Sequence, residues 1–285
     1  MRALSLLVVT LAAVSCTEAR QDSGLPPLAL EPEWRVGGFE SPESVLFNPD
    51  TGFLYVSNVA GGGGDVDGNG FISRLTPDGE IDTLRWAEGD MSAPKGLARL
   101  GDRLFTTDIT EIVEIGMASG AVLRRFPVEG AGFLNDAVAD EDGRVFVSDS
   151  ATGRIHVLED GQVSVWAEDP LMAAANGLWL EADRMLLITM ADRLVAIDRE
   201  SRAVTLIAEG VGNGDGLAAD GHGGYLANEW PGQTYRISPD GEVVVIADVR
   251  ADETYTNDFT IVDGILYTPH FNSGEVSASR IVVAR

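Results

Sequence analysis

The sequence of 285 residues contains a single cysteine, Cys16, and a single lysine, Lys95. With one cysteine, a disulfide within the chain is excluded, and a thiolate metal site is disfavoured. Basic residues are scarce: 20 stand against 45 acidic ones, and the net charge of −25 argues against a nucleic-acid-binding face. The sequence also lacks the Gly-x-Ser-x-Gly motif that holds the nucleophile of many serine hydrolases, so this chemistry has no support. Beyond its N-terminus it has no long stretch with helical apolar spacing, so a helical fold has no support either.

The first residues have the features of an export signal. Arg2 precedes an apolar run from Ala3 to Val14 that is too short to span a bilayer, so we expect residues 1–15 to be a signal peptide. The residues before Cys16 resemble the lipobox of bacterial lipoproteins, in which the cysteine is lipidated. A cleavable signal without lipid is the alternative. Residues 16–32 are expected to be a tether, stiffened by prolines near its end.

This N-terminus predicts where the protein is located. In Gram-negative lipoproteins a residue other than Asp after the lipidated cysteine implies the outer membrane, and here Thr17 follows Cys16. We therefore expect an exported outer-membrane lipoprotein or periplasmic protein, with secretion as the alternative. Contact with a membrane is expected only through the lipid anchor, and we expect a monomer with no nucleic-acid partner.

What the sequence has in abundance is a repeat. Six times, a short polar residue precedes an apolar stretch, and the first residues of the copies, from residue 43 to residue 257, are 52, 40, 41, 39 and 42 residues apart. The copies read Glu43-Ser44-Val45, Lys95-Gly96-Leu97, Asn135-Asp136-Ala137, Asn176-Gly177-Leu178, Asp215-Gly216-Leu217 and Asn257-Asp258-Phe259. A fixed period of this size is typical of a repeat architecture whose units stack on their neighbours.

Each unit predicts four short strands. In the third copy, apolar runs end at Ala139, Val147, Leu158 and Trp166, and Gly/Asp turns separate them. Four strands in about 40 residues predict one blade of a β-propeller. We therefore predict an all-β fold over residues 33–285, a six-bladed β-propeller. The sixth copy runs out after three strands, and residues 33–36 are expected to supply its fourth by pairing the N- and C-terminal strands.

The first strand of a propeller blade lines the central channel, so the leading residues of the copies should converge. They are Glu43, Lys95, Asn135, Asn176, Asp215 and Asn257 (or Asp258). Carboxylate and amide oxygens suit hard cations such as Ca²⁺ or Mg²⁺. Like charges in one channel repel unless a cation joins them, so Glu43 and Asp215 favour a metal.

These stretches resemble the regucalcin/gluconolactonase/luciferin-regenerating-enzyme group of six-bladed propellers. The resemblance covers roughly residues 33–285 and is carried by Pro42-Glu43-Ser44, Phe133-Leu134-Asn135-Asp136, Asn176-Gly177-Leu178 and Asp215-Gly216-Leu217. It implies one divalent metal, with Ca²⁺ expected and Zn²⁺ or Mg²⁺ as alternatives. The implied ligands are Glu43, Asn135, Asn176 and Asp215. Glu40, in Glu40-Ser41-Pro42, competes with Glu43, which matches the spacing to the next strand better.

The same resemblance implies a hydrolase of a small lactone or ester. In this hypothesis the metal polarises the carbonyl, Asp215 takes a proton from water, and Asn135 or Lys95 stabilises the developing oxyanion. Lys95 could equally serve as charge balance for Glu43 and Asp215. The rival interpretation is a non-enzymatic ligand-binding or scaffold propeller with a structural Ca²⁺, because propellers host both kinds of function.

Overall fold

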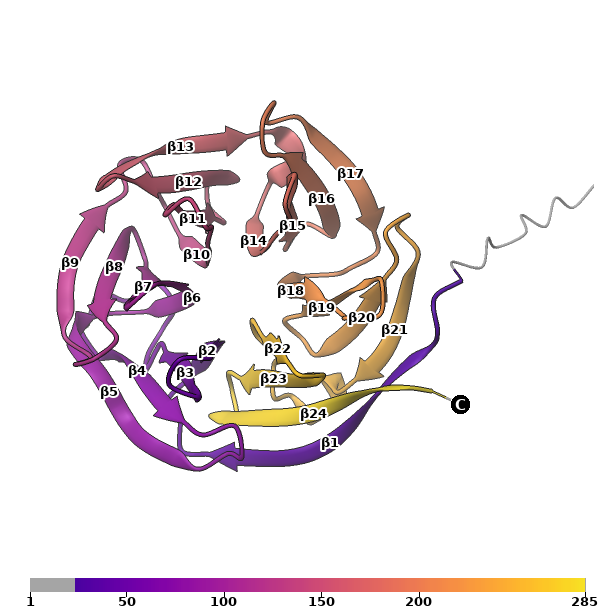
Figure 1. Cartoon of the computed structure of the whole chain (residues 1–285), viewed down its shortest axis with the longest axis horizontal. Coiled ribbons are helices and arrows are strands. Elements are labelled where there is room, and N and C mark those ends of the chain that lie inside the picture. The colour runs from indigo at the N-terminus through magenta and orange to yellow at the C-terminus, as the bar shows by residue number, and fades with distance from the viewer. Residues whose placement is uncertain (1–23, 285) are drawn as a thin grey trace, which may run out of the picture.

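The computed structural model describes residues 24–284, which form six antiparallel sheets of four strands around a common axis (Figure 1). The signal peptide predicted for residues 1–15 and the lipidated Cys16 lie outside the described residues. Blade one contains β2 (Pro42–Asn48), β3 (Phe53–Asn58), β4 (Gly70–Leu75) and β5 (Ile81–Met91). Blade two contains β6 (Pro94–Leu100), β7 (Arg103–Asp108), β8 (Glu111–Gly116) and β9 (Val122–Pro127).

The next three blades repeat this order. Blade three contains β10 (Leu134–Ala139), β11 (Val145–Asp149), β12 (Arg154–Glu159) and β13 (Gln162–Glu168). Blade four contains β14 (Ala175–Leu180), β15 (Arg184–Thr189), β16 (Arg193–Asp198) and β17 (Val204–Glu209), and the short 3₁₀ helix η1 (Pro170–Met172) precedes it. Blade five contains β18 (Gly214–Ala219), β19 (Tyr225–Glu229), β20 (Gln233–Ile237) and β21 (Val243–Asp248), and the 3₁₀ helix η2 (Arg250–Asp252) follows it.

Blade six closes the ring with strands from both ends of the chain. It contains β22 (Thr260–Val262), β23 (Ile265–His270), β24 (Glu275–Val283) and, outermost, β1 (Leu28–Gly37). β1 pairs antiparallel with β24 from Leu28↔Val283 to Gly37↔Glu275, which confirms the predicted closure. The closing strand begins at residue 28 rather than at the predicted 33, so the last five residues of the expected tether are part of the sheet. With this pairing, blade six has four strands like the other five blades.

The core is divided among the interfaces between blades, where six separate apolar clusters lie. Aromatic pairs fill two of these interfaces: the rings of Tyr55 and Trp86 are 4.7 Å apart, and those of Phe146 and Trp166 are 5.1 Å apart. Each sheet thus buries its faces by stacking on the two neighbouring blades, as the repeat predicted.

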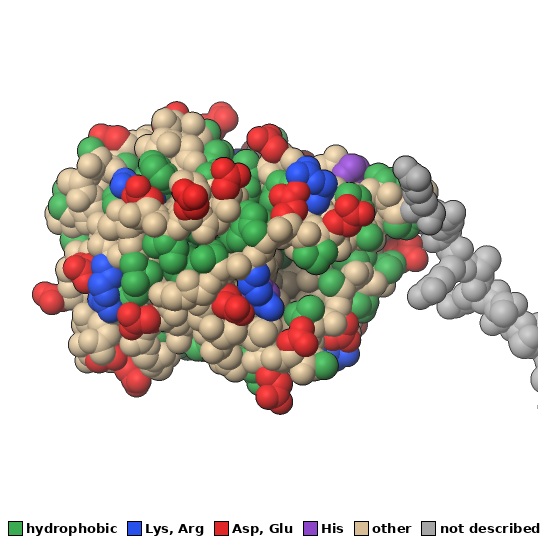
Figure 2. All heavy atoms as spheres, turned by 90° about the horizontal axis from the view of Figure 1, so that it is seen from below, with side chains coloured by type: hydrophobic (Ala, Val, Ile, Leu, Met, Phe, Trp, Pro, Cys, Tyr) green, Lys and Arg blue, Asp and Glu red, His purple; other side chains and the backbone are tan. Residues whose placement is uncertain are grey.

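The outside of the ring is acidic. On the face shown in Figure 2, carboxylates are spread over the surface and basic side chains lie singly among them. Within residues 24–284, no helix is long and apolar enough to cross a membrane.

Candidate metal centre in the channel

The leading residues of the repeats lie at an irregularity in the innermost strands. In blades one to five, the pairing of the first strand with the second shifts register at the repeat motif. The residues skipped by the regular pairing are Glu43 and Ser44, Lys95 and Gly96, Asn135 and Asp136, Asn176 and Gly177, and Asp215 and Gly216. A bulge of this kind re-aims side chains, and here it lies at the same level in five blades.

Side chains from the second strand hold the bulges in place. In three blades the skipped backbone N–H donates to such a side chain: Ser44 N to Ser57 Oγ (2.9 Å), Asp136 N to Ser148 Oγ (2.9 Å) and Gly216 N to Asn228 Oδ1 (2.7 Å). Because a buried N–H without a partner is costly, these polar residues in otherwise apolar strands fix the bulge geometry.

The glycines of the motifs allow the innermost strands to approach one another. A Cβ on Gly96 would lie 2.4 Å from the Cα of Asp136, and one on Gly177 would lie 2.0 Å from the backbone oxygen of Asp215. Any side chain at these two positions would collide with the backbone of the next blade. The glycines therefore keep the ring of leading residues tight.

The acidic residues that end two second strands anchor the start of the inner strand. Asp149, which is fully buried, accepts hydrogen bonds from the backbone N–H groups of Gly132 (3.1 Å) and Phe133 (3.0 Å), directly before Asn135. Asp108 does the same in blade two, accepting from Ser92 N (2.9 Å) and Ala93 N (2.7 Å). These residues position the channel residues of their own blades.

Replacing Asp149 by alanine is expected to lower the free energy of unfolding by about 3 kcal/mol, because the backbone N–H groups of Gly132 and Phe133 and the hydroxyl group of Thr152 lose their acceptor. Chemical denaturation measures the change, and the exposed Glu141 gives a matched control, Glu141→Ala, that should stay within about 0.5 kcal/mol of the parent protein. A loss no larger than that of the control would mean that Asp149 does not anchor its blade.

The structure brings all six predicted leading residues together around the axis and buries them. Their exposed fractions are 5% for Glu43, 3% for Lys95, 5% for Asn135, 2% for Asn176, 4% for Asp215 and 4% for Asn257. Glu40, the competitor for the first position, is instead exposed and forms a 3.2 Å ion pair with Arg85. The first-blade member of the ring is therefore Glu43.

Several oxygens of this ring have no partner among residues 24–284. The buried Oε2 of Glu43, Oδ1 of Asp215 and Oδ1 of Asn257 accept no hydrogen bond there. The amide nitrogens of two asparagines are engaged with the protein: Asn135 Nδ2 donates to Ser150 Oγ and Asn176 Nδ2 to the backbone oxygen of Gly214, each at 3.2 Å. This tethering leaves the amide oxygens of Asn135 and Asn176 available as acceptors.

Two further carboxylates lie beside the ring: Asp258, which the sequence offered as the alternative to Asn257, and Asp136, which was not predicted as a site residue. Asp258 accepts a 2.6 Å hydrogen bond from Ser44 Oγ, and Asp136 accepts from the backbone N–H of Leu178 at 2.7 Å. Both carboxylates also line a small cavity of about 170 Å³ at the inner strands. The available signal was the Asn-Asp pair that occurs in two of the six motifs.

Burial and mutual repulsion hold protons on these acids. Burial, with the charges of Asp215 and Asp258, raises the pKa of Glu43 well above its usual range. Burial, with the charges of Asp258 and Asp136, raises the pKa of Asp215 in the same way. Burial also raises the pKa of Asp258 to about 7. Four carboxyl groups thus share a space that holds one ammonium group.

That ammonium group belongs to Lys95, whose pKa burial lowers despite the nearby carboxylates of Glu43 and Asp108. Its Nζ donates to the backbone oxygen of Ala93 at 3.0 Å and lies 4.3 Å from the centre of the Phe133 ring. The glycine-rich loop of blade one reaches this place, because a Cβ on Gly63 would lie 3.8 Å from Lys95 Cε. The loop therefore lies next to the side chains of Lys95 and Phe133.

The donor set fits a hard cation better than a soft one. Within residues 24–284 no three His, Cys, Asp or Glu side chains are grouped as a metal site. The predicted set Glu43, Asn135, Asn176 and Asp215 instead combines two carboxylates with two carboxamides, all oxygen donors of the kind that Ca²⁺ accepts. The unpartnered oxygens of Glu43 and Asp215 fit such an ion, because a cation would satisfy them and offset their repulsion.

The sequence and the structure were compared with those of known proteins. No protein-family model matches the sequence, and no curated protein matches it. Among solved structures, a protein provisionally assigned as a gluconolactonase superposes with a TM-score of 0.68 at 18% identity, over 91% of this chain and 94% of that one. The two proteins therefore share their fold.

Two other solved structures share the fold. A luciferin-regenerating enzyme superposes with a TM-score of 0.65 at 16% identity, over 90% of this chain and 95% of that one. Virginiamycin B lyase from Staphylococcus aureus superposes with a TM-score of 0.64 at 12% identity, over 90% of this chain and 100% of that one. The resemblance predicted from the sequence is confirmed for the fold. Identities this low transfer no substrate and no residue role.

Proposed function

We propose that this protein is an exported, lipid-anchored hydrolase that opens a small lactone or ester with the help of one divalent cation in its channel. The observation that carries the proposal is the pair of buried carboxylate oxygens, Glu43 Oε2 and Asp215 Oδ1, that have no partner among residues 24–284. Placing two such acids side by side costs stability unless a cation or a reacting group meets them. Strong perturbation of buried acids in a channel is typical of functional sites.

Four residues would hold the cation. Glu43 and Asp215 would supply negatively charged oxygens. Asn135 and Asn176 would supply neutral amide oxygens, and the amide nitrogens of these two side chains donate hydrogen bonds to Ser150 and Gly214. We expect Ca²⁺, with Mg²⁺ and Zn²⁺ as alternatives, because the donors are all oxygen. When bound, the ion supplies a Lewis acid for the carbonyl oxygen of the substrate.

The side chains of the ring have separate roles in this proposal. Asp215 would both hold the cation and, in its ionised form, take the proton of the attacking water. Lys95 and Asn135 stabilise the negative charge that develops on the carbonyl oxygen, because both carry N–H donors in a site shielded from water. The loop containing Gly63 limits the size of the substrate at the side of blade two.

Hydrolysis of a panel of small lactones and aryl esters, followed by acid release with Ca²⁺ and with EDTA, tests the proposal. We expect turnover of at least one lactone, lost with EDTA and restored by Ca²⁺. The alternative function, a ligand-binding propeller with a structural Ca²⁺, is favoured by the same buried oxygens. It would be supported if no compound were hydrolysed while Ca²⁺ still raised the melting temperature.

Replacing Lys95 by methionine separates its two interpretations. If Lys95 stabilises the developing oxyanion, kcat is expected to fall at least 100-fold, the usual cost of one such donor. Affinity for Ca²⁺ should remain or increase, because the variant removes a positive charge next to Glu43. Kinetics and calorimetry on the same preparation measure both. A variant with unchanged kcat and altered Ca²⁺ affinity would show that Lys95 only balances charge.

A further inference from the structure

A second pocket lies away from the channel, between blades five and six. Its volume is about 470 Å³, within the range of pockets that hold small ligands. One wall comes from β20 and β21 and the other from β1, β23 and β24, which lie next to one another at the lower right of Figure 1. The channel residues Glu43, Asn176 and Asp215 do not line it.

The apolar packing between these two blades is thinner than elsewhere. The other five interfaces contain aromatic side chains from their second or outer strands, such as Tyr55, Trp86, Phe105, Phe146, Trp166, Tyr235 and Tyr267. Between blades five and six, the aromatic residues of the cluster are Trp179, on β14, and Phe259, directly before β22, and both lie at the inner strands. The outer part of this interface has aliphatic residues and the pocket. Trp34 also lines the pocket, but its ring packs against Tyr267 in the cluster between blades six and one.

A buried polar atom without a partner lines the pocket. His270 is 5% exposed, and its Nε2 lies 2.8 Å from Ser277 Oγ, whereas its buried Nδ1 has no partner among residues 24–284. Thr234 and Thr268, each 8% exposed, line the same pocket. Leaving the buried Nδ1 of His270 without a partner is costly unless a molecule in the pocket supplies one.

The charges at this pocket compensate one another at its rim. Arg35 pairs with Glu275 at 3.2 Å, and Glu33 pairs with Arg280. Inside, His270 is neutral, because burial and the nearby Arg35 lower its pKa to about 3. The interior thus offers neither an unpaired cation nor an unpaired carboxylate, and it suits an uncharged molecule.

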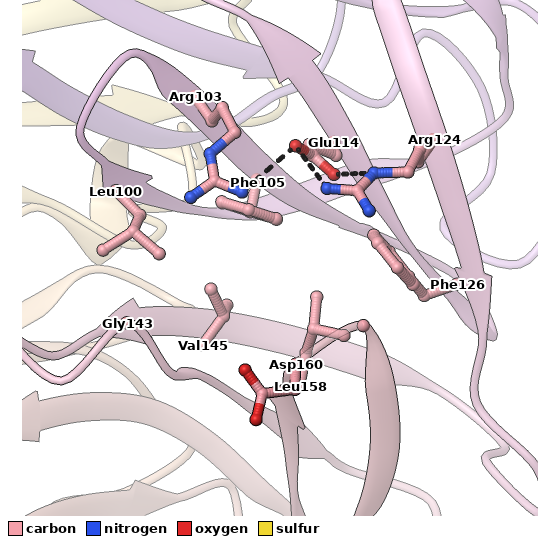
Figure 3. Close-up of a pocket in the computed structure, with 11 residues that line it drawn as sticks. Leu100, Arg103, Phe105, Glu114, Arg124, Phe126, Gly143, Val145, Leu158 and Asp160 are labelled. Atoms are coloured by element: carbon pink, nitrogen blue, oxygen red, sulfur yellow. Dashed lines mark hydrogen bonds and ion pairs between the residues drawn. The ribbon is translucent and has the colours of Figure 1, made fainter.

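The pocket between blades two and three differs, because its buried polar group has partners within the protein. It measures about 240 Å³, and its buried carboxylate, Glu114, is held between Arg124 (2.7 Å) and Arg103 (3.4 Å), as Figure 3 shows. Its central polar group therefore already has partners within the protein. Of these two pockets, only the one between blades five and six leaves a buried hydrogen-bonding atom without a partner among residues 24–284.

We propose that the pocket between blades five and six binds an uncharged small molecule with an apolar ring and a hydroxyl group. The ring takes the place that aromatic side chains fill at the other interfaces. The hydroxyl group both donates and accepts, so it can pair with His270 Nδ1 in either tautomer and with Thr234 or Thr268. This inference does not depend on the proposed hydrolase activity or on a metal.

Binding of 2-naphthol to the purified protein in EDTA tests the proposal, with naphthalene as the ligand that lacks the hydroxyl group. We expect one molecule of 2-naphthol per chain, bound at least tenfold more tightly than naphthalene. Absence of saturable binding up to millimolar 2-naphthol would overturn the proposal. So would a crystal soaked with the probe that shows only ordered water in the pocket.

Two variants locate the bound probe. Thr268→Val removes a hydroxyl group at nearly equal volume, and it should weaken 2-naphthol three- to tenfold while leaving naphthalene within twofold. Ser279→Phe places a ring in the pocket and should abolish binding of both compounds. Ser273→Ala, in the exposed turn between β23 and β24, is the control and should change neither. Unchanged 2-naphthol affinity in folded Thr268→Val and Ser279→Phe would mean that the probe binds elsewhere.

Discussion

Asp215→Asn is expected to abolish lactone hydrolysis, with a loss of at least 1,000-fold in kcat, and to weaken Ca²⁺ binding at least 100-fold. The carboxylate serves in the account both as a charged ligand and as the proton acceptor, so one substitution removes both contributions. Asparagine has nearly the same size and shape as aspartate, so the substitution removes the charge with little change in packing. Steady-state kinetics and calorimetric titration measure the two losses.

The same variant should be more stable than the parent protein when both are free of metal. Asp215 is buried beside Asp258 and Asp136, whose charges raise its pKa, so removing its charge relieves repulsion. An increase in the melting temperature in EDTA would separate loss of function from loss of fold. The exposed Asp183 gives the control, Asp183→Asn, which should match the parent in every assay. More than a tenth of the parent activity in Asp215→Asn would contradict the assigned role.

The metal-free protein is expected to lose stability as the pH rises from about 4 to about 7. Unfolded carboxyl groups titrate near pH 4, whereas the buried ones in the channel have raised pKa values, that of Asp258 reaching about 7. Between these limits the folded state binds more protons than the unfolded state. Stability contributed by those protons is therefore present below pH 4 and is lost as the pH rises, by about 1.4 kcal/mol per pH unit for each retained proton.

Calcium should flatten this dependence, because a bound cation replaces the protons on Glu43 and Asp215. Melting temperatures between pH 4.5 and 8, in EDTA and in Ca²⁺, measure the effect at low and at high ionic strength. Salt screens repulsion between surface charges but acts much less on buried groups, so the slope should persist at high salt. A metal-free protein whose stability rises over this range would contradict the assigned protonation of the channel.

The ring could be predicted from the sequence because its members repeat. Glu43, Asn135, Asn176 and Asp215 each begin a motif at a spacing that only a closed ring of blades explains, and the structure brings them together. Spacing also favoured Glu43 over Glu40, and the structure places Glu40 at the surface beside Arg85.

Features that depend on the packing of distant segments could not be predicted in this way. β1 begins at Leu28 because that residue pairs with Val283 and packs into the cluster between blades five and six, a partner 255 positions away. The position of Asp136 beside the ring follows from a bulge whose geometry rests on Ser148 of the second strand. His270 has no counterpart in the other repeats, so no periodicity indicated the pocket that it lines.

Titration of the metal-free protein with Ca²⁺ at pH 7, by isothermal calorimetry, tests the central claim of a channel metal most directly. We expect one ion per chain in the parent protein, release of protons on binding, and loss of the binding signal in Glu43→Gln and Asp215→Asn. Absence of binding by Ca²⁺, Mg²⁺ and Zn²⁺, or equal binding by the parent and both variants, would contradict it.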